Sequence, residues 1–212
     1  MKHLLSSIRI TFFLMLVLGV AYPILVTFIA QVVFPKQANG SLIYEDGRLR
    51  GSELIAQNFE KPEYFWPRPS AVSFNPLPSG GTNLGPIAQD LQKAVKERGE
   101  KLRAAHPGAG EPPQDLLFAS SSGLDPQESV SAIRYQASRV AAARNLSGET
   151  LEKLISEHIE HRQLGVLGEE VVNVLALNRA LDKMKPVLQS PTQEPAAQDQ
   201  IQPNHPSDSS GK

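Results

Sequence analysis

Residues Ile10–Phe34, ITFFLMLVLGVAYPILVTFIAQVVF, decide how this chain is placed in space. The run holds 25 residues without one charged side chain. At about 1.5 Å of rise per residue such a helix reaches roughly 37 Å, which exceeds the ~30 Å hydrocarbon core of a bilayer. A cleaved secretory signal has an apolar region of only about 7–15 residues followed by a small-residue cleavage site. Because this run is longer and ends without that pattern, we predict an uncleaved transmembrane anchor.

The basic residues on either side of the run indicate its orientation. Lys2 and Arg9 precede it and Lys36 follows it closely, whereas the next arginines lie farther along the chain. Because Lys and Arg accumulate on the cytoplasmic side of a span, this bias favours a cytoplasmic N-terminus. The bulk of the chain is then expected outside the cytoplasm.

Pro23 and Gln31 interrupt the apolar run. Proline removes a backbone donor, and the carbonyl that it frees is better satisfied by protein or water than by lipid. One interpretation is a tolerated kink with an interfacial amide. The alternative is that one face of the helix packs against other membrane helices.

The composition divides the chain into four parts. After the anchor, enough residues remain for one domain with a sizeable core, and from Pro186 onward the sequence has almost no large apolar residue, so the end of the chain is predicted to be disordered. The predicted parts are a short cytoplasmic N-terminus (1–9), the transmembrane helix (10–34), an extracytoplasmic domain (35–188) and a disordered tail (189–212).

Net charge and cysteine content narrow the function classes. The 212 residues carry a formal charge of −1 and no cysteine. Nucleic-acid binding has no electrostatic support, because no basic stripe is present. The absence of cysteine is compatible with an oxidising compartment, and a chain of this size can fold without disulfides.

Helix and strand signals alternate in the domain, which predicts a mixed α/β (α+β) fold. Asp46-Gly47 favours a tight turn between the strands 42–44 and 48–50, and Ser52 is placed to cap a short helix. After a Pro- and Gly-rich stretch, Pro86 is expected to open a helix that runs to about Ala105, with Ile87 on its buried face.

The second half of the domain continues this alternation. Asp125 and Glu128 match a capping box before a helix, and Ser147 is expected to cap the next helix, which Gly165 and Gly168 end. A short strand (171–174) and a last helix (175–184) complete the prediction, with disorder from Ser190 to Lys212.

Three polar boxes carry the candidate chemistry: residues 64–71, 79–86 and 120–126. In the second box, glycine amides, two hydroxyls and a following helix N-terminus suit a phosphate. In the first box, Phe65 or Trp66 can stack on a base and Arg68 can pair with phosphate. Neither common nucleotide fingerprint is present, so turn structure plus subunit docking is the competing interpretation. The candidate nucleotide or subunit contacts are Ser79, Gly80, Gly81, Thr82, Asn83, Phe65 and Arg68.

Catalytic and metal sites find less support. The sequence lacks the G-x-S-x-G elbow of serine hydrolases, although Ser79 and Ser121 are the serines that such chemistry would use. His158 and His161 lack the spacing of a metal pair and are expected on a solvated charged face, so no metal is expected. The arginines at 134, 139 and 144 are expected to pair with carboxylates or a partner surface.

Taken together, the boxes resemble the C subunit of the Kdp-type, ATP-driven potassium transport complex. The resemblance covers roughly residues 8–184, including the single N-terminal span. The sequence departs from the family pattern at 127–129 and 169–171, but these two local differences do not remove the resemblance. The segments that carry it are Gly51–Phe59, Tyr64-Phe65, Arg68–Ala71, Ser79–Pro86, Asp115-Leu116, Ser122–Pro126, Gln136, Arg139–Ala141, Arg144 and Val172–Asn178.

The resemblance implies a non-catalytic accessory subunit of a bacterial inner-membrane P-type potassium pump. In such a pump one partner subunit hydrolyses ATP and another forms the potassium channel, while the C subunit stabilises the assembly and acts as a catalytic chaperone that promotes ATP binding. The family's Ser-Gly-Gly box has been likened to the signature loop of ABC transporters, which makes ATP the implied ligand.

The predicted topology conflicts with direct ATP contact. A cytoplasmic N-terminus puts residues 79–81 outside the cell, where ATP is scarce, and we therefore favour extracytoplasmic contacts on the channel subunit. Two other functions stay open: a stand-alone membrane-anchored serine hydrolase and a nucleotide-binding regulatory module.

Overall fold

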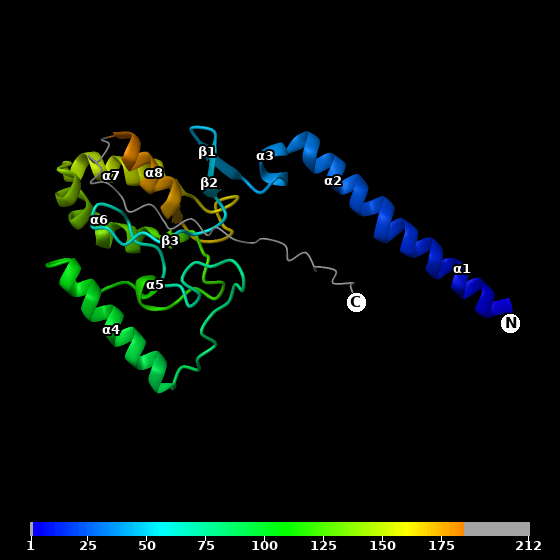
Figure 1. The fold of residues 1–212 in the computed structure, drawn as a ribbon, viewed down its shortest axis with the longest axis horizontal. Helices are drawn as coiled ribbons and strands as arrows, with labels where there is room; N and C mark the ends of the chain where they lie inside the picture. The colour runs from blue at the N-terminus through cyan, green and yellow to red at the C-terminus, as the bar shows by residue number, and fades with distance from the viewer. Residues whose placement is uncertain (1, 185–212) are drawn as a thin grey trace, which may run out of the picture.

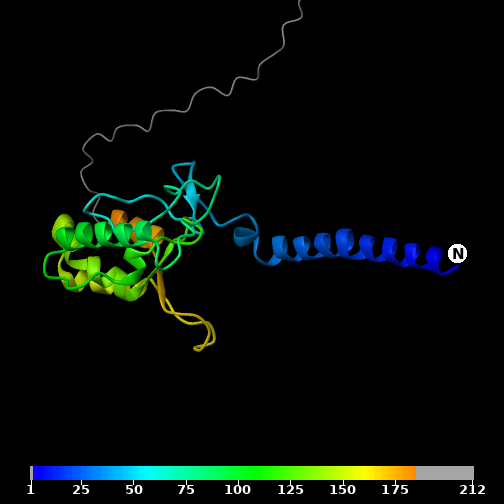
Figure 2. The same ribbon diagram turned by 90° about the horizontal axis from the view of Figure 1, so that it is seen from below.

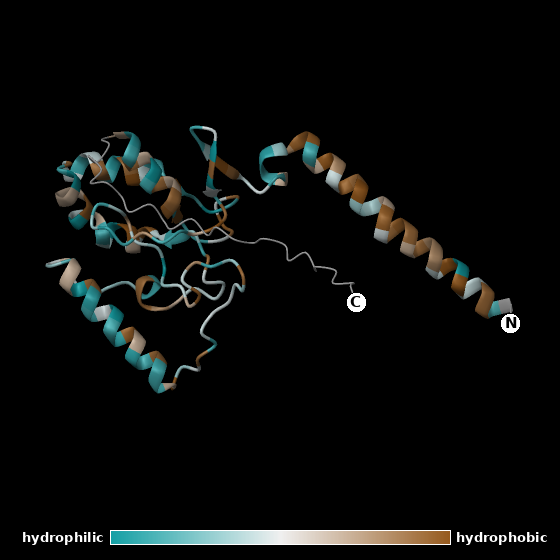
Figure 3. Cartoon of the chain, viewed as in Figure 1, coloured by the Kyte–Doolittle hydropathy of each residue, from teal (hydrophilic) through white to brown (hydrophobic). Residues whose placement is uncertain are grey.

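A computed structural model describes residues 2–184, so the tail predicted at 189–212, with its disorder from Ser190 to Lys212, lies outside the described residues. The chain opens with one continuous helical rod that projects from a mixed domain (Figure 1). The rod consists of α1 (Lys2–Leu16), a π-helical turn (Val17–Ala21) and α2 (Tyr22–Val33). Within the described residues, His3–Val33 is the one helix long and apolar enough to cross a membrane, and none of its most apolar window is buried (Figure 3).

The π-helical turn has a local cause in the sequence. Pro23 has no amide hydrogen, so the carbonyl four residues before it, on Gly19, loses its helical donor. The helix widens here, and the Tyr22 amide donates to the carbonyl of Val17, five residues back. Gln31 exchanges amide hydrogen bonds with Asn39, so this polar side chain is satisfied within the chain.

A one-turn helix and a hairpin connect the rod to the domain. Helix α3 (Pro35–Ala38) leads into β1 (Leu42–Glu45) and β2 (Arg48–Ser52), which pair antiparallel as predicted. The prediction of a helix after Ser52 is wrong. The Ser52 hydroxyl accepts from the Leu54 amide, as a cap would, but only a single turn forms before the chain becomes extended and the Ala56 amide donates to the Leu124 carbonyl.

The long helix α4 (Gln89–Ala105) ends where predicted but begins later than predicted. Pro86 and Ile87 form a turn, and Ala88 is extended at the N-cap. Ile87 is 88% exposed and does not belong to the buried face. The short helix α5 (Gln114–Leu117) follows.

The prediction of a capping box that begins a helix at Asp125 is also wrong. Residues Gln127–Ser129 form strand β3, and α6 (Val130–Arg144) begins directly after it. Its cap is Ser129, four residues beyond the predicted cap, and the Ser129 hydroxyl accepts from the Ala132 amide. The reason lies far along the chain, because β3 pairs antiparallel with β5 (Val171–Asn173). Tertiary pairing overrides the local capping pattern here.

The remaining elements follow the prediction more closely. Ser147 caps α7 (Gly148–Glu157), and α8 (Val174–Met184) follows β5 directly. However, α7 ends at Glu157 and not at the glycines. Strand β4 (Ile159–Glu160) completes the sheet in the order β3-β5-β4, and Gly165 and Gly168 lie in a loop that extends beyond β4 and β5 (Figure 2).

Two apolar clusters hold the domain together. The larger lies among α6, α7, α8 and β5, and the side chain of Phe65 fills it from the long loop between β2 and α4. The smaller joins α4, α5 and α6 through residues such as Leu102, Leu116 and Tyr135, with Trp66 against its edge. Consecutive loop residues thus serve different clusters.

Candidate functional site

Two buried side-chain amides fix the backbone of the first polar box. Asn178 on α8 accepts a hydrogen bond from the Phe65 amide and donates to the Phe65 carbonyl, both at 2.9 Å. Gln136 on α6 does the same for Trp66, at 2.8 and 3.1 Å. Each side-chain amide pairs with both the N–H and the C=O of one residue, as a neighbouring β-strand would. The extended loop segment is therefore held between α6 and α8. The alternation of an extended chain then directs Phe65 and Trp66 to different sides.

This arrangement corrects the expectation that Phe65 stacks on a base. Its side chain has no exposed surface and belongs to the larger apolar cluster. Phe65 is a core residue, and Trp66 is the aromatic that reaches a pocket.

Trp66 lies among cationic side chains. The Arg139 guanidinium lies 4.1 Å from the centre of the indole ring, and the Lys101 ammonium lies 5.5 Å from it. His106, which is buried, approaches the indole edge-on with ring centroids 5.5 Å apart. Cation–π attraction of this kind is strongest for tryptophan.

Arg139 differs from the other two arginines singled out from the sequence. Arg134 pairs with Glu152 and Arg144 with Asp182, as predicted. Arg139 instead donates to the backbone carbonyls of Pro62 and Tyr64 and to the side chains of His106 and Gln136, and no described carboxylate lies within ion-pair distance. Burial lowers its pKa to about 10.

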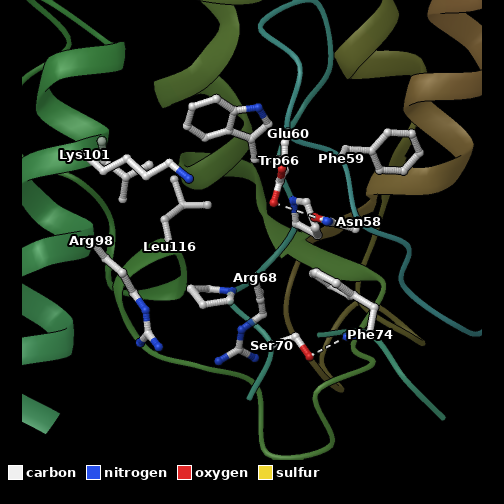
Figure 4. A pocket seen from close by; sticks show the side chains of 13 residues that line it. Asn58, Phe59, Glu60, Trp66, Arg68, Ser70, Phe74, Arg98, Lys101 and Leu116 are labelled. Carbon is white, nitrogen blue, oxygen red and sulfur yellow. Dashed lines mark hydrogen bonds between the residues drawn. The ribbon is translucent and has the colours of Figure 1, made fainter. Parts of the chain in front are cut away.

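The pocket beside Trp66 is a cavity of about 230 Å³ (Figure 4). Arg98 and Lys101 enter it from α4, and Arg68 enters it from the loop after Trp66. Its walls are largely apolar and include Phe59, Pro67, Pro69, Phe74, Leu102 and Leu116. We call this cavity with its cations the Trp66 pocket.

Most of the positive charge of the Trp66 pocket is not neutralised within the described chain. Arg68 forms an ion pair with Asp125 at 2.9 Å. Arg98 donates only to the Leu117 carbonyl, and its burial lowers its pKa. Neither Arg98 nor Lys101 has an acidic partner within 4 Å among residues 2–184. The single acidic residue of the lining is Glu60, which accepts from Asn58 at 3.2 Å.

The Ser-Gly-Gly box lies elsewhere and serves to join loops. The Gly80 amide donates to the Ser122 carbonyl at 3.0 Å, so it is not free to bind an anion. A Cβ on Gly81 would lie 2.9 Å from the Ser121 carbonyl oxygen, which means that the two backbones touch. Ser79, Thr82 and Asn83 are exposed and do not line the Trp66 pocket. Of the predicted contact residues, the structure therefore brings only Arg68 into the pocket.

Gly123 completes this junction from the third polar box. It has a positive φ of 68°, and a Cβ there would lie 2.6 Å from the Val72 side chain and 3.0 Å from the Gly80 carbonyl. Only glycine allows this approach. With α4 beginning at Gln89, the box also lacks the helix N-terminus that phosphate binding needs.

Changing Gly81 to alanine is expected to lower the free energy of unfolding by about 1–3 kcal/mol, because the new methyl group pushes against backbone that cannot rotate away. Gly85→Ala is the matched control, since a Cβ there meets nothing within 4 Å. Urea unfolding of both variants measures the difference. Equal stability of the two variants would contradict the close approach at Gly81.

The arrangement of the described residues does not support serine catalysis or metal binding. No hydrogen bond joins Ser79 or Ser121 to a histidine in residues 2–184. His158 contacts the Leu154 carbonyl and His161 contacts Glu170 at the surface. Across the described residues, no group of three His, Cys, Asp or Glu side chains is placed to hold a metal.

Glu128 has an unusual environment that the sequence did not reveal. This strand residue is 1% exposed, and neither carboxyl oxygen has a hydrogen-bond partner among the described residues. Burial, with a further contribution from the charge of Asp115, raises the pKa of Glu128 to about 9, although the Arg68 charge opposes this. The carboxyl group is therefore protonated and neutral at pH 7.

Sequence signals for the pocket existed but were not distinctive. Arg98 and Lys101 stand three residues apart, which places them on one face of a helix. Trp66 stands next to the arginine that was singled out. Nothing local shows that these two segments meet, because about 30 residues separate them.

Comparisons with known proteins address the whole chain. The family model described as "KdpC: K+-transporting ATPase, c chain" matches residues 4–183. A potassium-transporting ATPase KdpC subunit of Herpetosiphon aurantiacus is 54% identical over 171 residues, which cover 79% of this chain and 89% of the relative. The KdpC subunits of Serratia proteamaculans (49% identical; 87% of this chain, 100% of the relative) and Polaromonas naphthalenivorans (51%; 88% and 98%) are similar over even larger shares.

Proposed function

The chain belongs to the KdpC family, the c chain of the K+-transporting ATPase, and from this membership we propose a division of labour within the pump. The chain is an accessory subunit that does no chemistry itself. It stabilises the complex and, as a catalytic chaperone, promotes ATP binding by the ATP-hydrolysing subunit. Its anchor contacts lipid and partner helices, and its domain contacts the potassium-channel subunit.

One observation carries the indirect role: the Ser-Gly-Gly box is engaged within its own fold. The Gly80 amide binds Ser122, and Gly81 touches the Ser121 backbone. A phosphate cradle needs free amides that point at one centre. We therefore place the effect on ATP binding in contacts between subunits and not in an ATP site on this chain.

Steady-state kinetics of the complex test this role. We expect the KM for ATP of the pump purified without this subunit to be at least several-fold higher than that of the complete pump. Calorimetry of the full-length subunit in detergent with millimolar ATP is expected to show no binding heat. An unchanged KM would refute the chaperone role, whereas strong heat on the isolated subunit would assign it a direct ATP site.

We also propose that the protein lies in the bacterial inner membrane with its N-terminus in the cytoplasm and its domain outside. The helix His3–Val33 and the basic residues before it support this topology. The chain has no native cysteine, so a single introduced thiol is a clean reporter. A Thr82→Cys variant should react with a membrane-impermeant maleimide in intact cells that have a permeable outer membrane. His3→Cys should react only after lysis, and the reverse pattern would overturn the topology.

A further inference from the structure

The Trp66 pocket has the composition of a receptor for acidic side chains. We propose that it binds carboxylate side chains of an acidic segment on a neighbouring subunit of the pump. This proposal rests on the proposed function, because it takes the bound segment to belong to another pump subunit on the side of the membrane where the domain lies. The pocket itself is defined by the described residues alone.

Charge complementarity is the first argument. Arg98 and Lys101 project into the cavity without an acidic partner in residues 2–184, although the whole chain is slightly negative. Arg139 adds a third cation close to Trp66, and it too has no ion-pair partner within 4 Å among the described residues, although the charge of Glu63 acts on it. Leaving cations together without counter-charges is unfavourable, and it is relieved when anions bind.

The state of Arg98 strengthens this argument. Its guanidinium uses one Nη1 hydrogen bond to the Leu117 carbonyl at 2.8 Å, which fixes its direction. A guanidinium carries five N–H donors, so several remain for a ligand. A guanidinium oriented in advance binds a carboxylate in a two-pronged geometry with little further loss of freedom.

Size and shape favour side chains over a nucleotide. The cavity of about 230 Å³ is smaller than the roughly 300–1,000 Å³ of pockets that enclose drug-sized ligands. Arg139 lies over the indole ring and His106 makes a T-shaped contact with it, so part of the indole surface is already covered by this chain. Apolar walls beside the cations suit the methylene groups of a glutamate and a neighbouring aliphatic residue.

Glu60 offers the cations of the Trp66 pocket a counter-charge only from a distance. Its carboxylate is the single acid in the lining, it is exposed, and it is held by Asn58 outside ion-pair distance of the pocket cations. An entering acidic segment supplies the counter-charge that this residue provides only from a distance. Binding is therefore expected to weaken as salt rises.

Trp66 is the one tryptophan of the chain and reports on the pocket directly. The experiment titrates the full-length protein in detergent with the blocked peptide acetyl-Leu-Glu-Glu-amide while Trp66 fluorescence is recorded. We expect a saturable change whose apparent Kd weakens at least tenfold between 0.05 and 0.5 M salt. Acetyl-Leu-Gln-Gln-amide, which lacks the charges, should cause no saturable change.

Variants on α4 assign the binding to this pocket. Arg98→Gln with Lys101→Gln should weaken peptide binding at least tenfold, and Lys101→Gln alone should weaken it by a smaller factor. The matched control is Lys93→Gln with Lys96→Gln, which removes the same charge from exposed residues of the same helix outside the pocket. Thermal unfolding of each variant verifies that the fold is retained.

Each further outcome is decisive. Absence of binding, or equal binding by the pocket and control variants, overturns the proposal. Tighter binding of ATP or inorganic phosphate than of the acidic peptide, lost in the pocket variant, reassigns the site to phosphate ligands and also overturns it. The proposed function fails separately, in the KM experiment on the complex, which does not depend on these titrations.

Discussion

Replacing Glu128 with glutamine is expected to remove most of the pH dependence of the domain's stability between pH 5.5 and 8.5. At pH 8 the free energy of unfolding of the variant should be about 2–4 kcal/mol higher than that of the unchanged protein. The reason is that a single buried carboxyl group, 1% exposed and without hydrogen-bond partners in the described chain, resists ionisation in the folded state.

The sign follows from proton binding. The folded-state pKa of Glu128 is raised by burial to about 9, whereas the unfolded chain loses this proton near its ordinary value of 4.5. Between these values the folded protein binds more protons than the unfolded one, so stability falls as pH rises. The loss is about 1.4 kcal/mol per pH unit and ends above the folded pKa. Glutamine has no proton to lose, although its unpaired amide costs about 1–3 kcal/mol.

Urea unfolding of the full-length chain in detergent at pH 5.5, 7 and 8.5 measures this effect. Glu100→Gln is the control, because it removes a carboxylate from the exposed face of α4 and keeps the background titration of the other groups. The prediction fails if the unchanged protein and the Glu128 variant lose stability in parallel as pH rises.

Phe65→Ala is expected to destabilise the domain by about 3–5 kcal/mol, the usual cost of removing a buried aromatic side chain. Phe65 has no exposed surface and occupies the centre of the cluster formed by α6, α7, α8 and β5. The loss combines the transfer of an apolar side chain with a cavity that rigid helices cannot fill.

Denaturant unfolding distinguishes this core role from the base-stacking role considered from the sequence. Phe65→Leu keeps most of the apolar volume and should cost about 1–2 kcal/mol. Trp66→Phe, at the neighbouring residue, is the comparison. It is expected to lower the free energy of unfolding by less, because Trp66 is only half-buried. A Phe65→Ala protein as stable as the original would refute its place in the core.

Local sequence signals predicted the elements that depend on local energies. The hairpin turn at Asp46-Gly47, the Ser147 cap and the α8 helix were predictable because a positive φ, a capping hydroxyl and a helical repeat act within a few residues. The apolar N-terminal helix was predictable for the same reason, although it begins at Lys2 because a charged residue does not end a helix.

The failures share one cause, which is a partner distant in sequence. Asp125 and Glu128 have the spacing of a capping box, yet pairing with β5, more than 40 residues away, makes a strand of Gln127–Ser129. Pro86 is a favourable first helical residue, yet the helix begins at Gln89. No local pattern reports such competition.

The candidate site was predicted only in part for a related reason. Phe65 and Trp66 are adjacent aromatics in an extended segment, so one of them faces the core and the other faces outward. Which one does so is decided by Asn178 and Gln136, on helices far along the chain. The sequence left open whether Phe65 or Trp66 is the outward-facing aromatic, and Phe65, which was named among the candidate contacts, is the buried one.

The π-helical turn at Val17–Ala21 changes how side chains are arranged around the N-terminal rod. One extra residue in a turn advances the angular phase of all following side chains by about 100°, because an α-helix rotates by that angle per residue. A stripe of side chains that runs along α1 therefore does not continue along α2 but reappears a quarter-turn around the rod. A single straight neighbour can follow one half only. The N-terminal helical rod therefore presents two side-chain faces that are offset from each other, one along α1 and one along α2.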